Sequence, residues 1–168
     1  MAQLVGSALI EDIWRTIGAS SSATIRKLQK QCGKEQEELT GFLLGFTSDL
    51  RPEAFGLALY IHLVVVQAFR QSGGKFRRIR PGRIERTWQA NLAFIDDLKV
   101  RGHTHSPFRL ELDLTTEPAV MQYVVDALCE EDEESVELSA EEFWHILRVL
   151  KTVADCLHDA SIASEGAA

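Results

Sequence analysis

Residues 54–69 read AFGLALYIHLVVVQAF and form the longest apolar run of the chain. Pro52 precedes the run, and proline suits the first turn of a helix because its missing N–H would have no partner there. The sequence SGG at 72–74 follows and is typical of a helix end. At about 16 residues the run falls short of the roughly 20 needed to span a bilayer. The stretch therefore predicts a central buried helix over about 52–71, in a protein that does not insert into a membrane.

Helical periods on both sides of this stretch predict further helices that pack around it. The sequence shows no alternation of strands and helices and no repeat of fixed period. We therefore expect an all-α fold, an irregular bundle of six or seven helices within a single domain over 1–159, followed by a disordered tail over 160–168. The helices besides the central one are expected at about 7–17, 23–31, 34–47, 81–101, 116–130 and 140–158.

The last of these helices has the clearest signals. Ser139 and Glu142 have the spacing of a capping box, in which each side chain bonds the backbone N–H of the other residue. Apolar residues between Phe143 and Leu157 fill one arc of the helical wheel. The opposite side is expected to face water, and it carries Arg148, Lys151, Thr152 and Asp155.

One segment departs from the helical pattern. Over 108–114, apolar residues alternate with charged ones in a period of two, which predicts an extended conformation. A lone strand cannot pair its own backbone groups, so this segment needs a partner. Residues 76–80 are the candidate within the chain, and the same segment of a second copy would make a homodimer, which we expect.

Composition and cysteine usage favour a protein of a reducing compartment. The chain has 168 residues, 45% of them hydrophobic and 26% charged, as is ordinary for a globular protein. Its three cysteines, Cys32, Cys129 and Cys156, are odd in number and far apart, which argues against a disulfide framework. The first ten residues carry no lysine or arginine, so no secretory signal is indicated and a cytoplasmic location is predicted.

Positive charge is concentrated at one place in a chain whose net charge is −7. Six cations within 75–86 could meet an anion at a helix N-terminus, which would suit an acidic protein or an anionic ligand. Alternatively, they could neutralise the chain's own acidic segment at 130–142. A third interpretation is that the basic segment binds nucleic acid, but no recognised nucleic-acid-binding motif supports it. The six are Lys75, Arg77, Arg78, Arg80, Arg83 and Arg86.

Two pairs of polar residues are candidates for a small ligand. His62 interrupts the apolar run and Asn91 falls within the apolar stripe of the helix at 81–101, so together they could line a polar pocket between the two helices. His103 and His105 have a spacing that metal sites use, but two imidazoles do not make a site, and no metal or other cofactor is expected.

No catalytic residue is predicted, because the chain has neither a nucleophile elbow nor a phosphate-binding glycine loop. The leading interpretation is a small non-enzymatic interaction or regulatory protein that uses the basic segment 75–86 and the acidic segment 130–142. The alternative is an enzyme that binds a small molecule or a metal in a helical bundle, near His62 and Asn91. A further alternative is a nucleic-acid-binding protein that uses the basic segment.

Overall fold

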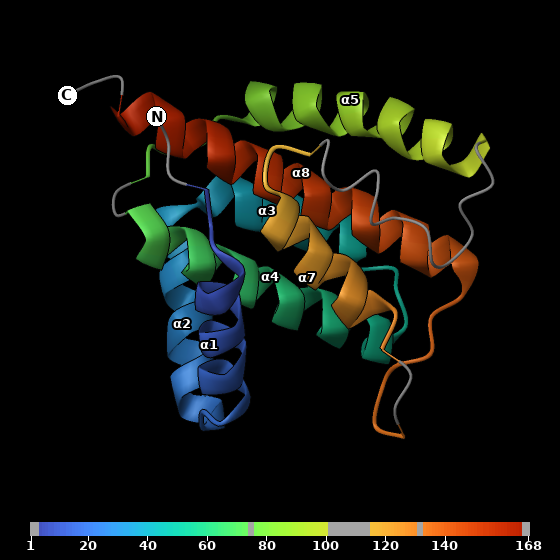
Figure 1. The fold of residues 1–168 in the computed structure, drawn as a ribbon, viewed down its shortest axis with the longest axis horizontal. Helices are drawn as coiled ribbons and strands as arrows, with labels where there is room; N and C mark the ends of the chain where they lie inside the picture. Colours follow the sequence, from blue (N-terminus) through green and yellow to red (C-terminus); the bar gives the residue numbers. More distant parts are fainter. Residues whose placement is uncertain (1–3, 74–75, 101–114, 131–132, 166–168) are drawn as a thin grey trace.

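The computed structural model describes residues 4–73, 76–100, 115–130 and 133–165, with side-chain surroundings described as far as Ser161. Within these ranges the chain forms seven helices and no strand, which confirms the predicted all-α fold (Figure 1). The segment at 108–114 and the end of the tail at 166–168 lie outside the described residues. The helices are α1 (Ser7–Gly18), α2 (Ser22–Glu35), α3 (Glu37–Thr47), α4 (Pro52–Gly73), α5 (Pro81–Val100), α7 (Pro118–Leu128) and α8 (Ala140–Glu165).

Two helices share the centre of the bundle. Helix α4 is buried along most of its length, as predicted, with Ala54, Ile61 and Val64 fully excluded from solvent. Helix α8 is equally central, because it packs against α3, α4, α5 and α7. In Figure 1, α8 runs across the molecule with α5 on one side and α4 and α7 on the other. The remaining two helices close one end, where α1 packs on α4 and α7, and α2 packs on α3 and α4.

Helix α4 is also long and apolar enough to cross a membrane by length and composition alone. However, 61% of its most apolar stretch is buried against the other helices. Core helices of globular proteins pass the same length and composition test, so these two properties do not place α4 in a membrane.

The boundary between the second and third helices differs from the prediction. Helix α2 continues through Gly33 to Glu35, and the break falls at Gln36, whose φ of −133° and ψ of 64° leave the helical region. A Cβ added at Gly33 would meet no atom within 4 Å, so nothing there demands a glycine. The break is set instead by long-range contacts of Gln36, whose side chain is buried and bonded to the segment that precedes α5.

Helix α8 departs from the prediction twice. It runs to Glu165, so the part of the predicted disordered tail at 160–165 is helical, and buried Ala160 shows that packing continues past Asp159. The prediction that one face of α8 meets water is also partly wrong, because Lys151 and Thr152 on that face are only 7% and 0% exposed. Helix α5 covers this face, and its Asn91 supplies the polar partners that such burial requires.

Candidate functional site

The basic segment forms a cleft at the start of α5. Five of the six predicted cations line one cavity of about 460 Å³, which residues of α8 close on the far side. Lys75 lies outside the described residues. We call this cavity the arginine cleft; it is lined by Arg77, Arg78, Ile79, Arg80, Gly82, Arg83, Arg86, Cys156, Asp159 and Ala160.

A buried glutamine holds the segment in place. The Nε2 of Gln36 donates to the carbonyl oxygen of Arg77 at 3.1 Å, and its Oε1 accepts the backbone N–H of Ile79 at 3.2 Å. Ile79 is itself buried, at 5% exposed. With the backbone fixed at these two points, the arginines on either side of Ile79 are exposed to solvent. The cleft is therefore a fixed feature of the fold and its cations are accessible.

The charge of the cleft is only partly balanced within the chain. Arg83 forms an ion pair with Asp159 at 3.2 Å, and Arg78 forms one with Glu37 on α3. The other three described arginines of the cleft make no ion pair with any described residue. Exposed ion pairs contribute at most about 1 kcal/mol, so an incoming anion could displace the two that exist.

The acidic segment does not supply the missing counter-charge. Its described part precedes α8 and includes the first turn of that helix, whereas the arginine cleft meets α8 near Asp159. The 20 residues from Ser139 to Asp159 correspond to roughly 30 Å of helix. The acidic segment also has another partner, because Glu142 accepts hydrogen bonds from Arg51 at 2.8 and 3.0 Å. Among the described residues, no ion pair joins the basic segment to the acidic one within one chain.

The one thiol at the cleft is not activated. Cys156 is fully buried, and burial raises the pKa of its thiol to about 11. The thiol is therefore neutral at physiological pH and a poor nucleophile. The guanidinium groups around it stay protonated and cannot serve as proton acceptors. The described lining of the cleft is suited to holding an anion rather than to transferring a group.

An aromatic groove lies beside the arginine cleft, between α3 and the first half of α5. Phe46 and Trp88 have ring centroids 4.6 Å apart, and Phe42 lies 5.4 Å from Trp88. Phe46 is 43% exposed, which is unusual for a phenylalanine and leaves a ring face open. The groove has a volume of about 450 Å³ and is lined by Glu38, Gly41, Phe42, Phe46, Pro81, Ile84, Glu85, Trp88 and Gln89.

The structure gives His62 and Asn91, the residues of the predicted polar pocket, separate surroundings. Helix α8 lies between α4 and α5 (Figure 1). Neither side chain lines the arginine cleft or the aromatic groove. His62 is buried with no partner for its Nδ1 among the described residues, and burial lowers its pKa to about 4. Asn91 instead accepts a hydrogen bond from Lys151 at 2.8 Å and donates to Thr152 and Asp155 at 3.1 Å each. These bonds pin α5 to α8.

His103 and His105 lie outside the described residues. Within the ranges that the structure describes, no three histidine, cysteine or acidic side chains come together as metal ligands would.

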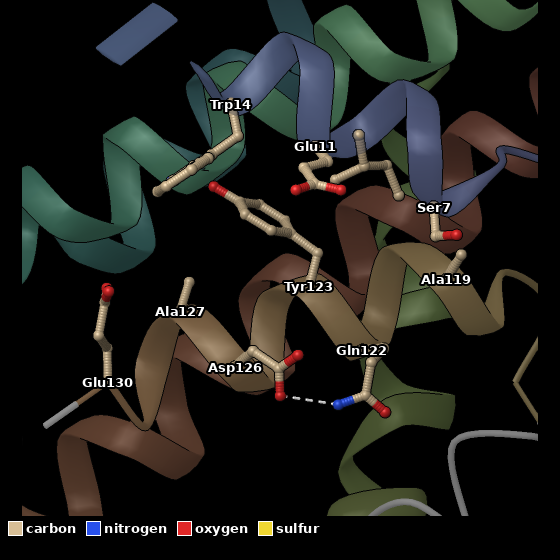
Figure 2. A pocket seen from close by; sticks show the side chains of 10 residues that line it. Ser7, Glu11, Trp14, Ala119, Gln122, Tyr123, Asp126, Ala127 and Glu130 are labelled. Carbon is tan, nitrogen blue, oxygen red and sulfur yellow. Dashed lines mark hydrogen bonds between the residues drawn. The ribbon is translucent and has the colours of Figure 1, made fainter.

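A third cavity, which the sequence did not predict, lies between α1 and α7 (Figure 2). Trp14 on α1 and Tyr123 on α7 contribute aromatic rings, and Trp14 is 42% exposed. The exposed tryptophan on a short amphipathic helix is the only sequence signal for it, because the two walls are more than a hundred residues apart along the chain.

Comparison of the chain with known protein families, with characterised proteins and with solved structures finds no match. No residue role can therefore be carried over from a relative.

Proposed function

We propose that the protein is a non-enzymatic interaction module that binds an acidic partner protein through the arginine cleft. The observation that carries the proposal is the gathering of five exposed arginines around one cavity, in a chain whose net charge is −7. Guanidinium groups bind carboxylates in bidentate geometry and remain charged at all physiological pH values. Three of the five make no ion pair with a described residue, so they are free to meet a partner's carboxylates.

The aromatic groove supports a protein partner over a nucleic acid. It lies along the same half of α5 as the cleft, so one partner segment could place acidic side chains in the cleft and an apolar side chain against Phe46 and Trp88. Buried aromatic anchors supply much of the binding energy of protein interfaces. Glu38 and Glu85 at the groove would repel a phosphate backbone that continued past the arginines.

The test is binding of a fluorescent peptide of about 15 residues that alternates glutamate with phenylalanine and leucine, measured by anisotropy. Arg80→Glu and Arg86→Glu together are expected to weaken binding at least tenfold, because each charge-assisted hydrogen bond is worth about 1.5–3 kcal/mol. These two arginines have no described ion pair, so their reversal breaks no described salt bridge. Added salt should also weaken binding.

A matched control carries the same change in net charge elsewhere. Arg26→Glu with Lys30→Glu alters two exposed cations of α2 that do not line the cleft, and binding should stay within about twofold of wild type. Phe46→Ser tests the groove and should weaken binding of the aromatic peptide without affecting one whose phenylalanines are replaced by serine. If a single-stranded DNA binds tighter than the peptide at physiological salt and the Arg80/Arg86 reversal abolishes that binding, the nucleic-acid reading replaces this one.

A further inference from the structure

The cavity between α1 and α7 shares no residue with the arginine cleft and has the opposite charge. Its volume is about 380 Å³, within the range of pockets that hold small molecules. We call it the α1/α7 groove; it is lined by Ser7, Ile10, Glu11, Trp14, Ala119, Gln122, Tyr123, Asp126, Ala127 and Glu130.

The walls of the α1/α7 groove are apolar and aromatic. Ile10 lines the groove and is buried, and the small side chains of Ala119 and Ala127 line it along α7. Figure 2 shows Trp14 descending from α1 and the ring of Tyr123 rising from α7 toward it. The faces of such rings attract cations through their quadrupole.

The rim of the groove is acidic. Glu11, Asp126 and Glu130 contribute carboxylates, and no lysine, arginine or histidine is among the lining residues. Two of the three have local partners, since Glu11 accepts from Arg15 at 2.6 Å and Asp126 accepts from the amide of Gln122 at 2.7 Å. Arg15 is exposed and does not line the groove, so carboxylates are the only charged groups among the lining residues.

A hydroxyl group in the wall lacks a hydrogen-bond partner. The Oη of Tyr123 is buried and bonds no described atom. Burial, with smaller contributions from Tyr60 and Glu130, raises the pKa of this phenol, so it stays protonated. Its oxygen can still accept a hydrogen bond, and a buried polar group without one is destabilising.

We propose that the α1/α7 groove binds a small organic cation, an ammonium group carried on an apolar or aromatic body. The carboxylates and the rings of Trp14 and Tyr123 would hold the charged end, and Ile10 with the two alanines would contact the body. A neutral molecule would leave Asp126 and Glu130 without a described counter-charge, and an anion would be repelled by the rim. This site is independent of the proposed acidic-partner function.

The test uses 2-phenylethylammonium chloride as the probe and 2-phenylethanol as its neutral counterpart. The readout is the indole N–H signal of Trp14 in a ¹H–¹⁵N NMR titration, assigned with Trp14→Phe. The cation should shift this signal saturably with a dissociation constant on the order of 1 mM, as expected for a ligand of about nine non-hydrogen atoms. The alcohol should bind at least tenfold more weakly.

Asp126→Asn with Glu130→Gln should weaken binding of the cation by at least fivefold and leave binding of the alcohol unchanged. The control is Glu38→Gln with Glu85→Gln, which removes two exposed carboxylates remote from the groove and should have no effect. Far-UV circular dichroism checks that each variant is folded. The proposal is overturned if the alcohol binds as tightly as the cation, if the Asp126/Glu130 variant binds like wild type, or if only a lysine-rich peptide shifts the Trp14 signal.

Discussion

The buried imidazole of His62 should make the protein sensitive to acid, and replacing it with leucine should remove that sensitivity. His62 is 5% exposed in the middle of α4, and burial lowers its pKa from 6.5 to about 4. In the unfolded chain the imidazole takes up a proton below about pH 6.5, whereas in the folded protein it does so only below about pH 4. Between these values the unfolded state holds the extra proton, so the free energy of unfolding falls as the pH falls.

The size of this effect follows from the shift. A difference of about 2.5 pKa units at 1.36 kcal/mol per unit corresponds to a loss of about 3 kcal/mol between pH 6.5 and pH 4. That is a large share of the roughly 5–15 kcal/mol typical of a folded domain. At neutral pH, His62→Leu should be at least as stable as wild type, because it removes a buried Nδ1 that has no described partner.

The assay is urea denaturation of wild type and His62→Leu at about pH 7.5, 6, 5 and 4.5. The difference in free energy of unfolding should widen as the pH falls, because carboxylates that protonate in both proteins cancel in the comparison. Gln67→Leu is the control, since Gln67 is equally buried on the same helix but does not titrate. Its difference from wild type should be the same at every pH. If His62→Leu behaves in that way too, the reasoning about the buried imidazole is refuted.

Three further predictions concern contacts that join segments far apart in the chain. Asn91→Ala should cost about 2 kcal/mol of unfolding free energy, because it removes one hydrogen bond from the buried Lys151 ammonium and one from the buried Thr152 hydroxyl, each of which keeps a second partner within α8. Exposed Gln89→Ala should cost under about 0.5 kcal/mol. Urea denaturation measures both. Glu117→Ala should cost about 1–3 kcal/mol and speed amide exchange at Val5, whose N–H bonds the Glu117 carboxylate at 3.1 Å; unchanged exchange would contradict this. Glu142→Gln should weaken the start of α8, and because Arg51 and Ser139 lower the pKa of Glu142 to about 2, its contribution is present above about pH 4.5 and lost as the pH falls toward 2. The measurement is the difference in thermal midpoint between wild type and Glu142→Gln. If this difference is the same from pH 7 to pH 3, the pH dependence does not come from the Glu142 carboxylate.

Most helices could be predicted because their signals are local. The start of α4 at Pro52 and of α5 at Pro81 are properties of proline and its neighbours, and they appear where the sequence places them. The errors come from contacts that no local pattern contains. Gly33 has the residue type of a helix end, but the chain breaks at Gln36, whose side chain is bonded to residues 77–79.

The face of α8 illustrates the same limit. A helical wheel records only the helix's own polarity, so Lys151 and Thr152 were predicted to face water. Both are buried because α5 brings Asn91 against them, and a polar side chain can be buried where it finds partners. The sequence singled out Asn91 as a polar residue in an apolar stripe, but it could not show that its partners lie on α8 rather than beside His62.

The two proposed binding sites were predictable to different degrees for the same reason. The arginine cleft is built mainly from one stretch of ten residues, 77–86, so the clustering of charge along the sequence is also clustering in space. The α1/α7 groove joins residues near position 10 to residues near position 125, and it exists only because α1 and α7 pack together against α4. The sequence of neither helix predicts that the other helix will form the opposite wall of the groove.

The separation of charge along α8 constrains any homodimer, which we retain as a proposal. Because the acidic segment and the arginine cleft lie at opposite ends of this helix, a parallel arrangement of two copies would set like charges against each other. A head-to-tail arrangement would bring opposite charges together but would leave one cleft and one acidic segment unused, and so would extend into a filament. Only an antiparallel pair related by a two-fold axis places each arginine cleft against the acidic segment of the other copy. Such a pair is a closed dimer with no unused cleft. In such a dimer the clefts would be occupied by the chain's own carboxylates, so an acidic partner would have to compete with the second copy for the arginines.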